Sequence, residues 1–193
     1  SQAVKLYEFI ITEGFCDHIV FSNYGGILQV QGKLNEAESF FRKAIELNPD
    51  FADAHSNLGN LLRDLGKLEE AELSTRKAIE LNPDFANAHF NLGNILRDLG
   101  KLKEAEISIS KAIELNPNNP IAYHNLGNIF GELGKLQYAE TSYHKAIQLK
   151  PNFVEAHNNL GTILIKLGKL KEAEISTRKA IELNPNYAGA LQN

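Results

Sequence analysis

The amino-acid sequence predicts an all-α protein, a solenoid built from stacked antiparallel helix pairs. The first observation is a fixed spacing of 34 residues, which five of the six prolines keep without an insertion: Pro49, Pro83, Pro117, Pro151 and Pro185. The second is a helical period in the apolar residues between these prolines. Self-similarity at a period of roughly 20–50 residues is the signature of proteins made of stacked repeats.

Glycine and alanine keep the same spacing at four more positions of the repeat. The glycines are Gly25, Gly59, Gly93, Gly127 and Gly161, and then Gly32, Gly66, Gly100, Gly134 and Gly168. The alanines are Ala37, Ala71, Ala105, Ala139 and Ala173, and then Ala44, Ala78, Ala112, Ala146 and Ala180. Because the side chains of Gly59, Ala71 and Ala78 are so small, we expect the two helices of a repeat to approach each other closely.

Residues 52–85 illustrate the two helices that we expect in each repeat. The first covers 52–65, where apolar residues recur at helical spacing: Ala54, Leu58, Leu61, Leu62 and Leu65. Gly66 ends this helix, since glycine adopts the left-handed conformation without strain. The second covers about 68–82 and places these residues inward: Leu68, Ala71, Ala78, Ile79 and Leu81. It ends at Asn82, because a proline disfavours helical geometry in the preceding residue.

The residue after each periodic proline is expected to cap the next helix. Its side-chain oxygen would accept a hydrogen bond from the first turn. The residues in this position are Asp50, Asp84, Asn118, Asn152 and Asn186.

The period divides the chain into a single array. Five complete repeats are expected at 18–51, 52–85, 86–119, 120–153 and 154–187. Residues 1–17 match the second helix of a degenerate earlier repeat, and residues 188–193 match the start of a further one. We also expect no polar terminal helix of the kind that solenoids usually carry. We therefore expect a segment of a longer protein, or one that covers its C-terminal end by self-association.

Composition narrows the class of protein further. The net charge of −4 gives no electrostatic basis for binding nucleic acid. The single cysteine, Cys16, excludes an internal disulfide and fits a reducing compartment. There is no apolar run of about 20 residues that could span a bilayer, and no signal-peptide pattern at the N-terminus. We expect a soluble cytoplasmic protein that binds neither nucleic acid nor membrane.

The motif from Asn57 to Pro83 resembles the tetratricopeptide repeat. It reads N-L-G-x-x-x-x-x-L-G-K-L-x-x-A followed by K-A-I-x-L-x-P, and the resemblance covers essentially the whole chain. It implies a right-handed superhelix whose concave inner wall is lined by the first helix of each repeat. Members of the family are adaptors that hold peptides or partner domains, so the resemblance implies a scaffold without catalytic activity of its own.

The inner wall implied by this resemblance is rich in asparagine. One row occupies the sixth position of each repeat: Asn23, Asn57, Asn91, Asn125, Asn159 and Asn193. A second row occupies the ninth position: Asn60, Asn94 and Asn128. A side-chain amide offers an acceptor and two donors, which complement a peptide group. Such a ladder would hold an extended peptide by its backbone, largely independent of the peptide sequence.

This ladder resembles the repeat arm of O-linked N-acetylglucosamine transferases, which grips extended protein substrates. The strings Ala54-His55-Ser56-Asn57-Leu58 and Ala88-His89-Phe90-Asn91-Leu92 are similar to that arm. Recent duplication of the repeats explains the recurring asparagines equally well, since Lys103 to Ser108 recurs unchanged at Lys171 to Ser176. Both interpretations stay open at the level of the sequence.

Two further side chains are candidates for the peptide site. Phe90 and His124 occupy the fifth position of consecutive repeats, where they would form a shallow pocket for an apolar side chain. The other recurring histidines, His55, His89 and His157, are too far apart for one zinc ion, whose ligands each reach within about 2.1 Å. Neither a catalytic constellation nor a nucleotide-binding motif is present, and we expect no cofactor and no metal.

Three hypotheses for function follow. The first is a protein-interaction scaffold that binds extended peptide segments, of unknown identity, in a concave asparagine-rich groove. The second is the substrate-docking arm of a larger enzyme, such as a glycosyltransferase or an oxygenase, whose catalytic domain lies outside this segment. The third is a repeat module that assembles with itself.

Overall fold

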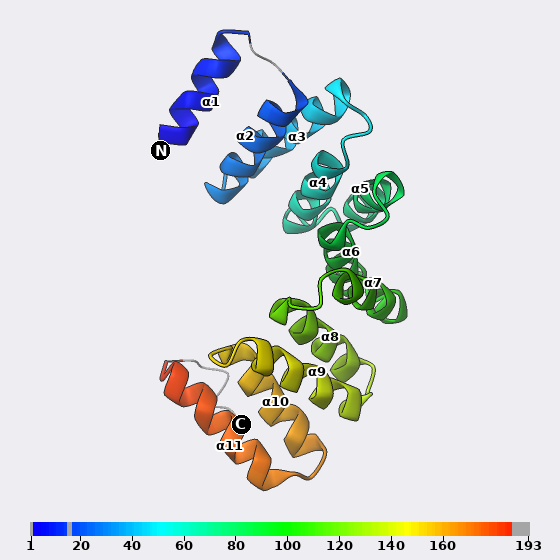
Figure 1. Ribbon diagram of the computed structural model, residues 1–193, viewed down its shortest axis with the longest axis vertical. Coiled ribbons are helices and arrows are strands. Elements are labelled where there is room, and N and C mark those ends of the chain that lie inside the picture. The colour runs from blue at the N-terminus through cyan, green and yellow to red at the C-terminus, as the bar shows by residue number, and fades with distance from the viewer. Residues whose placement is uncertain (1, 15–16, 187–193) are drawn as a thin grey trace. The chain divides into compact units, whose positions relative to one another are not determined.

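The computed structural model describes residues 2–14 and 17–186, and this part of the chain contains eleven helices and no strand (Figure 1). Cys16 and Asn193 lie outside the described residues. The helices of the first half are α1 Gln2–Thr12, α2 His18–Val30, α3 Leu34–Leu47, α4 Ala52–Asp64, α5 Leu68–Leu81 and α6 Ala86–Asp98. Those of the second half are α7 Leu102–Leu115, α8 Pro120–Glu132, α9 Leu136–Leu149, α10 Val154–Lys166 and α11 Leu170–Leu183.

The helices form two compact units, Ser1–Leu99 and Gly100–Asn193. In the first unit α2 pairs with α3 and α4 with α5, while α3 packs on α4 and α5 on α6. In the second unit α8 pairs with α9 and α10 with α11, while α7 packs on α8 and α9 on α10. Within each pair the second helix runs back along the first (Figure 1). Both units therefore have the expected all-α architecture of stacked antiparallel helix pairs.

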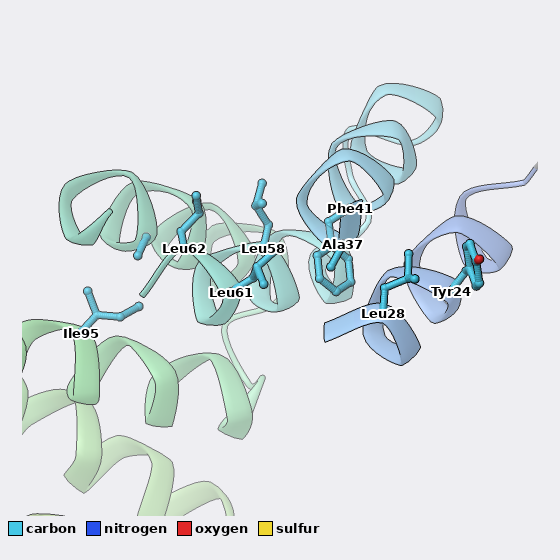
Figure 2. Close-up of a cluster of buried hydrophobic side chains, with 9 residues drawn as sticks. Tyr24, Leu28, Ala37, Phe41, Leu58, Leu61, Leu62 and Ile95 are labelled. Atoms are coloured by element: carbon cyan, nitrogen blue, oxygen red, sulfur yellow. The ribbon is translucent and has the colours of Figure 1, made fainter. Parts of the chain in front are cut away.

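A continuous apolar core joins the helix pairs of the first unit (Figure 2). Its buried members come from five helices: Tyr24, Leu28, Ala37, Phe41, Leu58, Leu61, Leu62, Ala71 and Ile95. Stacking successive pairs buries apolar faces that a single pair would leave in water. One prediction was incomplete, because Thr75 is also fully buried on α5. Its hydroxyl donates to the backbone oxygen of Ala71 at 2.8 Å, so the polar atom is satisfied.

Glycine fulfils two different roles in each helix pair. Gly66 has a φ of 75° and follows the end of α4, where the amide of Lys67 donates to the Leu62 oxygen at 2.8 Å. This is the left-handed helix ending that glycine favours, as predicted. Gly127 lies inside α8, and a Cβ atom there would come within 2.7 Å of Tyr143 Cε1 on α9. The absence of a side chain at Gly127 is therefore what lets the two helices approach.

The predicted helix caps are wrong. The N-cap residues of α4, α6 and α10 are Phe51, Phe85 and Phe153, which make no side-chain cap. At α8 the cap is Asn119, one residue after the expected Asn118. Of the other expected caps, Asp50, Asp84 and Asn152 each precede the N-cap by one residue, and the helix expected after Asn186 lies outside the described residues.

The asparagine before the proline stabilises the turn instead. Asn82 Oδ1 accepts from the amide of Asp84 at 3.2 Å, and Asn48 and Asn184 accept in the same way from Asp50 and Asn186. A side-chain oxygen that bonds the amide two residues on closes a local turn. The helices that follow, α4 and α6, begin at Ala52 and Ala86, the first positions of their repeats.

Candidate functional site

The predicted asparagine row lies on the first helix of each pair. In the first unit Asn23 is on α2, Asn57 on α4 and Asn91 on α6. In the second unit Asn125 is on α8 and Asn159 on α10. Asn23 and Asn57 are exposed, and the other three are half-buried. Phe90 and His124 are both half-buried but belong to different units, so each is described with its own unit.

In the first unit, the row asparagines bond to the preceding first helix. Asn57 Nδ2 donates to Ser22 Oγ at 3.4 Å, and Asn91 Nδ2 donates to Ser56 Oγ at 3.3 Å. Both serines are buried, so each bond satisfies a hydroxyl that water reaches poorly. Since an amide nitrogen has two hydrogens, Asn57 and Asn91 each keep one donor and the carbonyl oxygen for another partner.

In the second unit, the equivalent asparagine is engaged more fully. Asn159 Nδ2 lies 3.0 Å from Asn128 Oδ1 and 3.1 Å from His124 Nε2, so both of its hydrogens have acceptors. Asn159 Oδ1 accepts from Asn158 Nδ2 at 3.3 Å. Asn128 Oδ1 also accepts from the Tyr143 hydroxyl at 2.7 Å. Asn159 is therefore a structural bridge between α8 and α10, and little of its amide is left for a ligand.

The asparagines of the second predicted row also differ in whether a ligand could reach them. Asn94 is buried on α6, with 9% of its surface exposed, and is not presented to a ligand. Asn128 belongs to the network of the second unit. Asn60 is half-buried on α4, one helical turn after Asn57. Of the second row, Asn60 is the residue that extends the polar surface around Asn57.

The recurring histidines His55, His89 and His157 hold turns. Their Nε2 atoms lie 2.8, 2.8 and 2.9 Å from the backbone oxygens of Pro49, Pro83 and Pro151. A carbonyl oxygen only accepts, so each Nε2 carries a hydrogen. The histidines thus fix the start of the first helix to the preceding turn. In the part of the chain that the structure describes, no group of three or more His, Cys, Asp or Glu side chains could hold a metal ion.

A row of ion pairs connects a second helix to the N-cap lysine of the next second helix. Lys67 Nζ lies 2.9 Å from Glu38 Oε2, Lys135 Nζ lies 2.7 Å from Glu106 Oε2, and Lys169 Nζ lies 2.6 Å from Glu140 Oε1. The hydrogen bond from Lys67 is the main cause that holds the pKa of the Glu38 carboxyl below its usual value, and Arg42 acts in the same direction. In the same kind of pair, the hydrogen bond to the Glu140 carboxylate raises the pKa of the Lys169 ammonium group above its usual value.

Sequence reasoning missed a groove that recurs on the second helices. In the first unit it has a volume of about 660 Å³ and an apolar lining of Ile45, Leu58, Leu62 and Leu73. In the second unit it has a volume of about 440 Å³ and an apolar lining of Ile147, Leu160, Leu164 and Ile175. Leu73 and Ile175 occupy equivalent repeat positions and are 73% and 70% exposed. A large aliphatic residue on a face otherwise rich in Glu and Lys was the signal for it.

Family models match the chain over a continuous span. Three copies of a TPR repeat model match residues 59–100, 93–134 and 127–168, and further tetratricopeptide repeat models match 20–51, 40–72 and 154–187. The chain belongs to the tetratricopeptide repeat family. The TPR fold is a protein-interaction module that is typically non-catalytic, so this chain is a protein-interaction scaffold.

Solved TPR structures agree with this assignment. The chain is 26% identical to YrrB, described as "a TPR protein with an unusual peptide-binding site", with 96% of each chain covered and a TM-score of 0.76. It is 26% identical to MamA, covering 85% of this chain and 96% of that one, with a TM-score of 0.77. PilF of Pseudomonas aeruginosa, at 22% identity, shares the fold with a TM-score of 0.83 over 90% of this chain and 79% of that one.

No curated protein matches the sequence. Within the described residues, no helix of this TPR chain has the length and apolar character needed to cross a membrane.

Proposed function

We propose that this TPR array binds extended peptide segments through the side-chain amides on its first helices. The observation that carries the proposal is the pair Asn57 and Asn91 on consecutive first helices of one unit. Each uses one amide hydrogen to bond a buried serine of the preceding helix. The serine therefore fixes the orientation of the amide, while its second hydrogen and its oxygen remain available. Donor and acceptor together complement a peptide group.

The proposed site is narrower than the ladder that the sequence suggested. It comprises Asn23, Asn57, Asn60 and Asn91 in the first unit, with Phe90 beside Asn91 as an apolar contact for a ligand side chain. In the second unit, Asn125 is a weaker candidate because it lies against His124. Asn94, Asn128 and Asn159 are assigned to structure because they are buried or already bonded. YrrB, a relative at 26% identity with a peptide-binding site of its own, supports a peptide as the class of ligand.

The affinity should be low. A hydrogen bond between neutral groups contributes about 0.5–1.5 kcal/mol after the exchange with water. Ordering a flexible peptide costs a large part of what a few such bonds supply. We expect a dissociation constant on the order of micromolar or weaker.

The test is a double substitution, Asn57→Ala with Asn91→Ala. Binding is followed by NMR chemical-shift perturbation on adding two unstructured peptides of unrelated sequence, rich in Ser, Thr and Pro. We expect wild-type shifts with both peptides and about a tenfold weakening in the double variant, which is the loss of about 1.4 kcal/mol. The matched control is Asn35→Ala with Asn118→Ala, two exposed asparagines outside the proposed site. Binding that survives in the Asn57/Asn91 variant, with helical content unchanged, would sink the proposal.

The remaining hypotheses stay predictions with tests of their own. A substrate-docking arm of a glycosyltransferase or oxygenase requires a catalytic domain in the same reading frame, which the gene surrounding this segment would reveal. Self-association predicts a mass that rises with concentration in a light-scattering dilution series. A cytoplasmic location, inferred from the single cysteine, is tested by cell fractionation. We propose no catalytic activity, no cofactor and no nucleic-acid partner.

A further inference from the structure

His124 lies where the two helix pairs of the second unit meet. Its ring packs against two aromatic rings, with centroid distances of 5.7 Å to Tyr143 on α9 and 5.0 Å to Phe153 before α10. Its Nδ1 atom is 3.2 Å from Asn125 Oδ1, and its Nε2 atom is 3.1 Å from Asn159 Nδ2. An asparagine amide therefore contacts each nitrogen of the imidazole.

The hydrogen bonds of Asn159 fix the protonation state of this imidazole. Asn159 Nδ2 has two hydrogens, and its two acceptors are Asn128 Oδ1 at 3.0 Å and His124 Nε2 at 3.1 Å. In the structure, Asn128 Oδ1 also accepts from the Tyr143 hydroxyl at 2.7 Å. Asn159 Oδ1 in turn accepts from Asn158. His124 Nε2 must then be an unprotonated acceptor, and the imidazole proton lies on Nδ1.

We infer that His124 is a pH-sensitive latch between α8 and α10. In the neutral form it accepts from Asn159 and joins the two helices. A second proton on the ring places an N–H opposite the N–H of Asn159, so the bond is lost. Imidazole changes its charge between about pH 5 and pH 8. The latch is closed at the upper end of this range and opens as the pH falls. Its effect on a ligand rests on the proposed peptide-binding function, but the latch itself does not.

His157 on α10 provides an internal contrast. Its Nε2 atom lies 2.9 Å from the backbone oxygen of Pro151 and must carry a hydrogen to bond there. A second proton enters at Nδ1 and leaves that bond intact. The two histidines of the same unit thus differ in tautomer, and protonation breaks an interhelical bond only at His124.

Titratable and charged side chains lie on the elements that pack around α8. Tyr143 on α9 uses its hydroxyl as a donor to Asn128. Lys150 Nζ lies 4.6 Å from the centroid of Phe153, so a positive charge already stands on the aromatic ring that His124 contacts. Glu155 at the start of α10 is exposed, and on α7 the ion pair of Lys111 with Glu114 is formed at 2.8 Å.

The first unit contains the same latch without a titratable group. At the position equivalent to His124, Ser22 and Ser56 accept from Asn57 and Asn91. A serine hydroxyl accepts a hydrogen bond at any pH in the range concerned. His124→Ser is therefore the substitution that should keep the latch and remove its pH dependence, while His157→Gln is the matched control.

The first experiment is ¹H–¹⁵N NMR of the imidazole nitrogens between about pH 8 and pH 5. We expect the Nδ1–H tautomer for His124 and the Nε2–H tautomer for His157 at the upper pH. The second is amide hydrogen exchange of α10 and α11, compared as protection factors at both ends of this range. We expect wild-type protection to fall roughly three- to tenfold at low pH, which corresponds to the loss of one hydrogen bond. His157→Gln should show the same fall, and His124→Ser should not.

Three results would overturn the latch. They are an Nε2–H tautomer for His124 at pH 8, protection in α10 and α11 that does not depend on pH, and a pH dependence that persists in His124→Ser. None of these measurements uses a ligand. A failure of the Asn57/Asn91 peptide experiment therefore counts against the proposed function alone, and a failure here counts against the latch alone.

Discussion

Replacing Gly127 with alanine adds one methyl group at a point where α8 lies directly against Tyr143 of α9. A Cβ atom there would lie 2.7, 2.8 and 2.9 Å from Cε1, Cδ1 and Cζ of Tyr143. The ring cannot move aside easily, because it is 3% exposed and its hydroxyl donates to Asn128 at 2.7 Å. The extra methyl must therefore separate the two helices or displace the ring from its hydrogen bond.

The magnitude follows from two opposing effects. Overpacking a close-packed core costs about 1–3 kcal/mol. Alanine inside a helix is favoured over glycine by about 1 kcal/mol, which offsets part of that cost. The expected net loss for Gly127→Ala is therefore about 0–2 kcal/mol. On the same helix Gly131 provides the control, since its nearest neighbour would be Ile163 Cδ1 at 3.4 Å, an ordinary contact. Gly131→Ala should therefore be neutral or up to about 1 kcal/mol more stable than wild type.

Urea denaturation followed by far-UV circular dichroism measures both variants. A third variant, Gly127→Ala with Tyr143→Ala, tests the cause, because removing the ring should make the added methyl harmless or favourable. If Gly127→Ala equals Gly131→Ala in stability, the steric explanation of the glycine register is wrong. It is equally wrong if the penalty at Gly127 is unchanged once Tyr143 is absent.

Two further predictions concern bonds within the first unit. Because the pKa of Glu38 is lowered in the folded protein, its pair with Lys67 contributes full stability above the unfolded value near pH 4.5 and loses it as the pH falls through the folded value. Glu38→Gln should therefore cost about 0.5 kcal/mol at pH 7 and progressively less as the pH falls below about 4.5, and a cost in urea titrations that does not change with pH contradicts this. His55→Phe keeps the aromatic bulk that Phe21 supplies at the equivalent position but removes the bond to the Pro49 oxygen. It should cost about 1 kcal/mol in thermal unfolding, whereas exposed His144→Gln should cost nothing.

The features that the sequence predicted are those set by the backbone. A left-handed glycine after each first helix and a glycine without room for a Cβ atom can both be read from the period, because no other residue type suits those places. The buried alanines of the second helices were also predicted from the period. The helix caps were wrong since the asparagine before the proline, as well as the Asp or Asn after it, can satisfy a backbone amide. Which one does so depends on where the chain turns.

The candidate site was harder to predict, because whether each asparagine amide is available to a ligand depends on its contacts with residues about one repeat away in the sequence. Asn57 and Asn159 have the same position in their repeats and similar neighbours in sequence. Asn57 meets a serine and keeps part of its amide available, while Asn159 meets His124 and Asn128 and keeps almost none. Equal spacing therefore does not imply equal availability. The recurring groove beneath Leu73 and Ile175 was missed for a related reason, since it is formed by three helices at once.

The bonds between the asparagine row and the preceding helix have a consequence for how such arrays change by recombination. At three junctions a bond joins the fifth residue of one repeat to the sixth residue of the next, as in Ser22 with Asn57 and His124 with Asn159. Copying or exchanging one whole repeat brings along one member of the pair on each side and leaves both original partners behind. The bond between repeats is kept after such an exchange where the new neighbour also presents a hydrogen-bond acceptor at its fifth position. The inherited unit is thus the junction between two repeats, and a library of shuffled arrays should be selected on those two residues together.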